Sequence, residues 1–122
     1  MIERVDMQIK SWEDSGVTIV TVTGRIDSLT APELGNALRT YIDHGKVNLV
    51  LDLSQVDYAS SATIHIVTAA LREARAASGD LRLAGIQPTV RRLFSMSGLT
   101  MVAEFFADSQ AAIDSFSRKG TA

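Results

Sequence analysis

Cysteine is absent from this chain of 122 residues, which excludes both a disulfide framework and a thiolate metal site. No single charge is concentrated either. The 12 lysines and arginines and the 14 acidic residues are scattered, so no basic face for nucleic acid is indicated. No run approaches the roughly 18 uncharged apolar residues of a membrane span, and the first residues are charged where a signal peptide is apolar. These absences predict a cytoplasmic protein that neither binds nucleic acid nor inserts into a membrane.

The residue patterns that usually mark an enzyme are also missing. There is no glycine-rich loop with a phosphate-binding spacing, and the acidic residues show no metal-ligand spacing. The two histidines, His44 and His65, are far apart, and neither belongs to a sequence pattern that suggests a catalytic triad. We expect His44 at a helix C-terminus, where its charge suits the dipole, and His65 on the outer or flanking face of another helix. The sequence therefore predicts no catalytic activity, metal or cofactor.

Hydrophobic periodicity predicts a single α/β domain with its core at about 3–117 and a short tail at 118–122. The order is ββαβαβαβα, which is typical of a mixed, mostly parallel sheet with right-handed crossovers. Thr30 and Glu33 have the spacing of a capping box, and Ser109 is expected to cap the last helix. We expect strands at 3–11, 17–23, 47–53, 81–84 and 100–106, and helices between Thr30 and Gly45, over 61–77, between Pro88 and Gly98, and after Ser109.

Two adjacent serines stand at the most informative junction of the chain. The apolar strand 47–53 runs into a short polar loop at 54–60, and Ser60 and Ser61 then open an amphipathic helix. A serine at this position can cap the helix by accepting a bond from a free backbone N–H. It can also carry a phosphate, because those N–H groups and the helix dipole favour negative charge. The residues alone leave both interpretations open.

Four blocks of the chain, in order and at matching separations, resemble segments of one protein family. Residues 24–31, Gly-Arg-Ile-Asp-Ser-Leu-Thr-Ala, are similar to a Gly-x-Leu-Asp-x-x-Thr-Ala segment. Residues 51–56 resemble the strand before a regulatory loop, 78–83 a helix stop and the next strand, and 90–99 a late helix with its closing Ser-Gly-Leu. These are segments of the STAS domain family, and within it of the bacterial anti-sigma factor antagonists. The resemblance covers nearly the whole chain and implies the STAS fold.

The regulatory motif departs from the family pattern. Where the family has Asp-Ser-Ser-Gly-Leu, this chain has Ala59-Ser60-Ser61-Ala62-Thr63. In register, Ser60 falls on the serine that the family's cognate kinase phosphorylates, and Ser61 is the second choice. Alanine at 59 cannot accept a hydrogen bond. Alanine at 62 favours helix by up to about 1 kcal/mol over glycine, so we expect a stiffer segment than in the family.

The resemblance implies a binding switch without catalytic activity of its own. In the family, the unmodified protein binds an anti-sigma factor that is a serine kinase, phosphorylation of the serine separates the two, and a serine phosphatase resets the cycle. A phosphoserine adds about −1.5 to −2 charges, which a helix start tolerates and a close-packed acidic partner surface does not. By this implication the partner-binding residues are Asp27, Ser28, Asp57, Tyr58, Ser60, Ser61 and Ala62.

Two other functions stay open at this point. The altered motif also suits a STAS subunit that is never phosphorylated and serves as an adaptor or scaffold in a stress-signalling or membrane-transport complex. Nucleotide binding by the domain itself is the third alternative, although no phosphate-cradling motif supports it. The oligomeric state is open too, because Ile66, Ala69 and Ala70 can pack within the monomer or form a weak homodimer.

Overall fold

Strands and helices follow one another in the order that the sequence predicts. The computed structural model describes residues 7–117, so the expected strand residues 3–6 and the expected tail lie outside the described residues. The elements are β1 (Met7–Asp14), β2 (Val17–Ile26), α1 (Ala31–Asp43), β3 (Asn48–Ala59), α2 (Ser61–Ala76), β4 (Asp80–Ala84), α3 (Pro88–Met96), the short 3-10 helix η1 (Leu99–Met101), β5 (Phe105–Phe106) and α4 (Ser109–Ser117).

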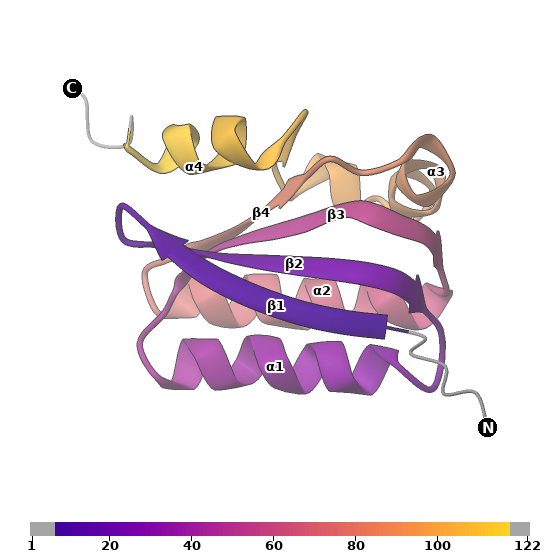
Figure 1. Ribbon diagram of the computed structural model, residues 1–122, viewed down its shortest axis with the longest axis horizontal. Helices are drawn as coiled ribbons and strands as arrows, with labels where there is room; N and C mark the ends of the chain where they lie inside the picture. The colour runs from indigo at the N-terminus through magenta and orange to yellow at the C-terminus, as the bar shows by residue number, and fades with distance from the viewer. Residues whose placement is uncertain (1–6, 118–122) are drawn as a thin grey trace.

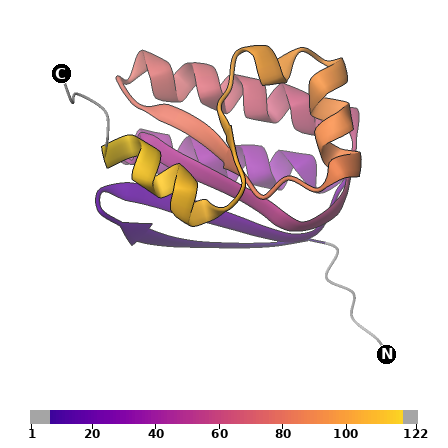
Figure 2. The same cartoon turned by 90° about the horizontal axis from the view of Figure 1, so that it is seen from above.

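The strands form one sheet in the order β1-β2-β3-β4-β5, with β1 antiparallel to β2 and the other neighbours parallel (Figure 1). Helices α1 and α2 cover one face of the sheet and α4 lies on the other (Figure 1). Figure 2 shows α3 at the end of the sheet where the parallel strands finish. Apolar side chains on both faces of β3 explain this central position. The main core includes Leu34, Leu38, Leu49, Leu51, Leu53, Val67 and Leu71, and a smaller cluster under α4 includes Ile19, Val50, Ile113 and Phe116.

Strands β1 and β2 each continue three residues past their predicted ends, and two other predicted segments are wrong. The segment 54–60 is not a loop, because β3 continues to Ala59 and pairs with β2 through two register shifts, with Val56 fully buried. The predicted strand at 100–106 is reduced to the two residues of β5. Leu99 and Ala103 are both buried, whereas Met101 midway between them is 85% exposed. A strand would place all three on one face, so this pattern suits a helical turn. The apolar run after residue 98 therefore begins as η1.

The end of α1 is as predicted, whereas the start of α4 is not. His44 is the C-cap residue of α1, with its Nδ1 2.8 Å from the carbonyl O of Thr40, and Gly45 follows with a φ of +86°. At α4 the Oδ1 atom of Asp108 accepts the N–H of Ala111 at 2.8 Å. Ser109 was expected to be the cap, but its hydroxyl donates to a carboxylate oxygen of Asp52 on β3.

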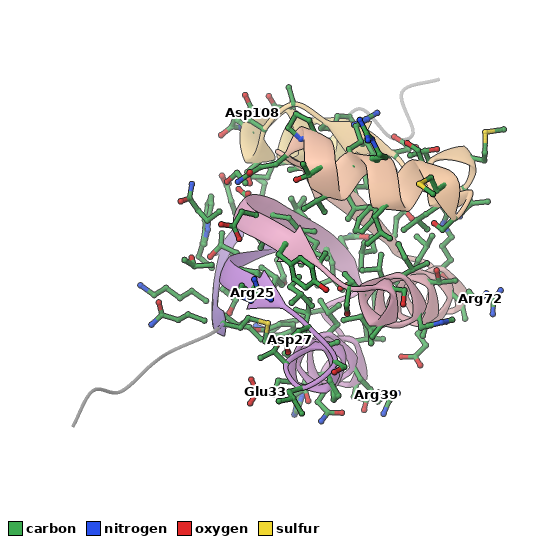
Figure 3. All side chains as sticks on the ribbon, turned by 90° about the vertical axis from the view of Figure 1, so that its right-hand side faces the viewer. Arg25, Asp27, Glu33, Arg39, Arg72 and Asp108 are labelled. Carbon is green, nitrogen blue, oxygen red and sulfur yellow. The ribbon has the colours of Figure 1, made fainter. Side chains whose placement is uncertain are left out.

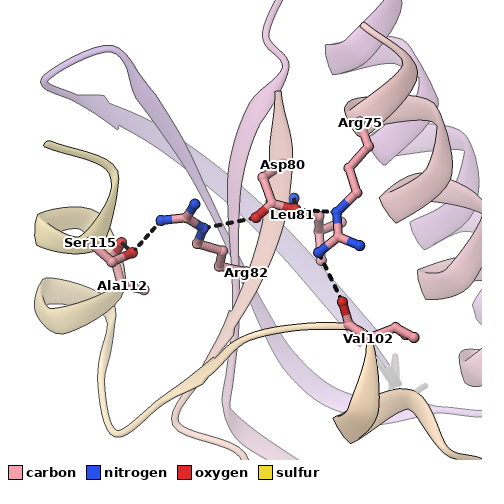
Figure 4. A network of polar contacts seen from close by, with 7 residues as sticks. All are labelled: Arg75, Asp80, Leu81, Arg82, Val102, Ala112 and Ser115. Atoms are coloured by element: carbon pink, nitrogen blue, oxygen red, sulfur yellow. Dashed lines mark hydrogen bonds and ion pairs between the residues drawn. The ribbon is translucent and has the colours of Figure 1, made fainter. Parts of the chain in front are cut away.

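A polar cluster, which we call the Asp80 network, ties α4 to the edge of the sheet where β4 begins (Figure 4). The carboxylate of Asp80 accepts Nε–H of Arg75 and Nε–H of Arg82, each at 2.9 Å. Arg82 is largely buried and donates from Nη1 to the hydroxyl of Ser115 at 2.7 Å. Arg75 donates from Nη2 to the carbonyl O of Val102 at 2.9 Å. Because removing one partner would leave a buried charge unpaired, we expect substitutions in this network to destabilise the fold.

Candidate functional site

The candidate site lies at the end of the sheet where β2 and β3 finish side by side. Ile26 pairs with Ala59 as the last residue of each strand, and the N–H of Ser60 donates to the carbonyl O of Ile26 at 2.8 Å. Asp27 and Ser60 therefore leave adjacent strands together. Figure 3 looks at this end of the molecule, with α1 below the strands, α2 to the right and α3 above.

The two serines have different surroundings. Ser60 is the N-cap residue of α2, with extended backbone angles, but its side chain makes no capping bond. Its Oγ is buried and has no hydrogen-bond partner among residues 7–117, and the same holds for Oγ1 of Thr63 one turn later. Ser61, the first residue of α2, is exposed. Of the two interpretations of the serine pair, side-chain capping by Ser60 is not seen in the structure.

Asp27 organises the turn between β2 and α1. Its Oδ1 accepts the N–H groups of Leu29 and Thr30, each at 2.9 Å, and the hydroxyl of Thr30 at 3.1 Å. The Thr30 hydroxyl also lies 3.0 Å from the carbonyl O of Arg25, so the predicted capping box of Thr30 is absent. These contacts lower the pKa of Asp27, chiefly through the hydrogen bond from the Thr30 N–H. Partial desolvation of the carboxylate opposes this shift. Leu29, the Thr30 hydroxyl and the charge of Arg25 lower the pKa further. The carboxylate is therefore charged at neutral pH.

The Asp27 turn leads to a pH-dependent prediction. Asp27→Ala should lower the melting temperature at pH 7, and the difference from wild type should shrink as the pH falls below about 4. A carboxylate whose pKa is lowered on folding stabilises above its unfolded pKa, and the stabilisation is lost as the pH falls through the folded pKa. Thermal unfolding followed by circular dichroism between pH 7 and pH 3 measures this. Asp57→Ala, an exposed control, should change little, and an Asp27 effect independent of pH would contradict the assignment.

The predicted partner residues lie at or just after the ends of β2 and β3 and differ in their exposure. Ser28 is exposed beside Asp27, and the ring of Tyr58 is covered by the guanidinium of Arg25, with Cζ 4.3 Å from the ring centroid. Asp57 is exposed and lines a hollow of about 190 Å³ between the end of β3 and the first residues of α3. Ala62 is half-buried and packs against the core. No role was predicted for Arg25 from the sequence. Its position two residues before Asp27 was the signal that could have indicated one.

Two further hollows flank α2. The larger, which we call the α2–α3 groove, has a volume of about 320 Å³ and is lined by Ser61, Ile64, His65, Leu93, Met96 and Ser97. The smaller, of about 150 Å³, lies between α1 and α2 and includes Gly35, Arg39, Ile66, Ala69 and Glu73. His65 is exposed, as predicted for a flanking face. Of the three residues considered for self-association, Ala69 is exposed, whereas Ile66 and Ala70 pack against the core.

Nothing in the described part of the chain indicates a membrane span or a metal site. Among residues 7–117, no helix is both long and apolar enough to cross a bilayer. The same residues contain no group of three or more histidine or acidic side chains arranged to hold a metal ion. This end of the molecule presents hydroxyls, carboxylates, the guanidinium of Arg25 and hollows beside α2 and α3.

Comparisons with known proteins agree with the architecture over most of the chain. The family model "STAS domain" matches residues 8–112. BtrV of Bordetella bronchiseptica, provisionally named an anti-sigma factor antagonist, is 32% identical over 101 residues, covering 83% of this chain and 87% of that protein. An anti-sigma factor antagonist from Mycobacterium paratuberculosis has a crystal structure with 26% identity and a TM-score of 0.82, covering 89% and 92%. The phosphorylated form of the Bacillus cell fate determinant SpoIIAA has 22% identity and a TM-score of 0.70, covering 90% and 98%.

Proposed function

Because the chain belongs to the STAS domain family, we propose that it is an anti-sigma factor antagonist whose binding is controlled by phosphorylation at the start of α2. One observation carries the proposal: Ser60 and Ser61 stand where β3 turns into a 16-residue helix, beside the charged Asp27 turn. Relatives named as anti-sigma factor antagonists support the partner class. The SpoIIAA structure supports the modification, because it is the structure of a phosphorylated form.

The electrostatics of this end suit a switch. A phosphate adds about −1.5 to −2 charges, and the free N–H groups of the first turn of α2 favour negative charge, so the fold tolerates it. Asp27 and Asp57 already place carboxylates around the junction. A partner packed closely against this end would meet the added charge in a partly desolvated interface, where like charges cost several kcal/mol. A difference of that size is enough to separate the two proteins.

The family register favours Ser60 as the acceptor, and exposure favours Ser61. The buried Oγ of Ser60 must turn outward before a kinase can reach it, whereas the side chain of Ser61 is already exposed. Ala59 is half-buried against the core and cannot orient the serine as a carboxylate could. We keep Ser60 as the first choice and Ser61 as the second, and the following experiment decides between them.

The test is to incubate the protein with its cognate anti-sigma factor kinase and ATP and to map the modified residue by mass spectrometry. Label on Ser60 that is lost in Ser60→Ala and kept in Ser61→Ala supports the first choice, and the reverse pattern supports the second. Removal of the label by the cognate serine phosphatase would complete the cycle. Label that survives in the double alanine variant would contradict the site.

A second candidate function is favoured by the altered motif itself. The alanines at 59 and 62, together with the buried Ser60 hydroxyl, also fit an adaptor or scaffold that is never phosphorylated. Affinity purification separates the two functions. If an ATP-binding anti-sigma factor is recovered with the wild type but not with Ser60→Asp, the switch is supported. If scaffold or transporter subunits are recovered equally with both, the adaptor is supported.

A further inference from the structure

Two segments of this chain, which has a net negative charge, contain no acidic residue. Segments 60–72 and 85–103, which form most of α2, all of α3 and η1, contain neither aspartate nor glutamate, although the chain has 14 acidic residues. The same segments contain Arg72, Arg91 and Arg92. The structure brings the two segments together at the α2–α3 groove. The charged side chains of the two segments are therefore all arginines, of which Arg91 lies over the ring of Phe105, with its Cζ 4.9 Å from the ring centroid.

The α2–α3 groove has an apolar floor. Two exposed arginines, Arg72 on α2 and Arg92 on α3, lie outside its lining on the helices that form it, and we call this pair the basic rim. Ile64 and Leu93 are half-buried in the groove, and Met96 is 79% exposed at its edge. Arg92 lies one helical turn before Met96 on α3, so both side chains belong to the same stripe of that helix. Arg72 lies two turns after His65 on α2, where Figure 3 shows it pointing outward.

The acidic residues that flank the two segments in sequence, Asp57, Glu73 and Glu104, form no ion pair with this rim within residues 7–117. Neither Arg72 nor Arg92 forms an ion pair within residues 7–117. Glu73 faces α1, where it lies 4.0 Å from Arg39. Asp57 lines the separate hollow at the first residues of α3.

We infer that the α2–α3 groove binds an acidic amphipathic helix of the protein partner. This inference rests on the proposed function, and it names the chemistry of the partner surface. Helices bind grooves through apolar anchors spaced along one face, and an exposed methionine adapts to such anchors. The free arginines supply charge complementarity, which raises association rates and rejects basic partners. Ser61 lines the same groove, so a phosphate on this serine pair would compete with the acidic helix for the basic rim.

A pair of synthetic peptides tests the inference without the natural partner. One is a helical peptide of about 18 residues with leucines along one face and glutamates elsewhere, and the other replaces every glutamate with lysine. In amide NMR titrations of the protein, only the acidic peptide should bind, with shifts in the first turns of α2 and in α3. Arg92→Glu should weaken it by about tenfold or more, and Lys10→Glu on β1 should not change it. Equal binding of both peptides, or shifts at α1 instead, would overturn the inference.

The anti-sigma factor then separates this inference from the switch itself. Met96→Glu and Arg92→Glu change exposed side chains, so the fold should persist, and both should weaken the complex. If these variants bind normally while Ser60→Asp does not, the groove assignment fails and the switch stands. If they fail to bind while Ser60→Asp binds normally, the groove stands and the switch fails. Self-association that Met96→Glu abolishes, without an effect on the anti-sigma factor, would assign the groove to a second copy of the chain and overturn the inference.

Discussion

Ser60→Asp should weaken the complex with the anti-sigma factor by about a hundredfold or more, which corresponds to about 2.7 kcal/mol. Residue 60 is held at the end of β2 by the bond from its backbone N–H to the carbonyl O of Ile26. The new carboxylate would therefore be added close to the turn that begins with the charged Asp27. Aspartate is a favourable N-cap residue, so α2 should form normally. Titration calorimetry with the purified partner measures the affinity, and circular dichroism checks the fold.

The neutral variant Ser60→Asn is the matched control for the charge. Asparagine has nearly the shape of aspartate and caps helices equally well, so it isolates the electrostatic part of the effect. Ser11→Asp on the exposed strand β1 controls for a general effect of added negative charge. The switch would be wrong if Ser60→Asp bound as tightly as Ser60→Asn.

Gly79→Ala should destabilise the protein by about 3 kcal/mol or more and lower its melting temperature by about 10 °C or more. A Cβ atom at residue 79 would lie 2.0 Å from the carbonyl O of Val47. That oxygen belongs to rigid backbone, because it accepts the N–H of Asp80 at 3.0 Å. Two connections of the parallel sheet would have to move apart to make room for one methyl group. Thermal and urea unfolding measure the loss.

Gly35→Ala is the control for this prediction. A Cβ atom there would lie 3.2 Å from Cγ2 of Ile66, which is a side-chain atom that can shift by a few tenths of an ångström. Residue 35 lies inside α1, where alanine is favoured over glycine by up to about 1 kcal/mol. The variant should therefore be near neutral. Equal effects of the two substitutions would show that the contact with Val47 does not determine stability.

The order of elements could be predicted from the sequence because it depends on local hydrophobic spacing. The features that escaped prediction depend on neighbours distant in sequence. The polar pair Ser54-Gln55 looks like the start of a loop, and only pairing with β2 extends β3 to Ala59. Ser109 looks like a cap, and only the approach of Asp52 diverts its hydroxyl.

The candidate site could be predicted only in part, for the same reason. The position of the serine pair followed from the strand-to-helix pattern and the family motif. The burial of the Ser60 hydroxyl did not, because no sequence pattern reports which atoms cover a side chain. The α2–α3 groove joins Ile64 and Leu93, which are 29 positions apart (93 − 64), so it appears only once the two helices are placed. The absence of acidic residues in both segments was the sequence signal that could have indicated it.

The Asp80 network lies where β4 begins, and the serine pair follows the other end of the parallel strands, where β3 finishes. The residues that anchor α4 are thus separated from the proposed partner-binding residues by the length of the strands. Substitutions of exposed residues at the partner-binding end, such as Ser28 and Ser61, leave the Asp80 network intact, so duplicated copies of such a gene can diverge in the partner that they bind. Redesign of binding specificity has the same freedom, provided that the Asp80 network and the Asp27 turn are left unchanged.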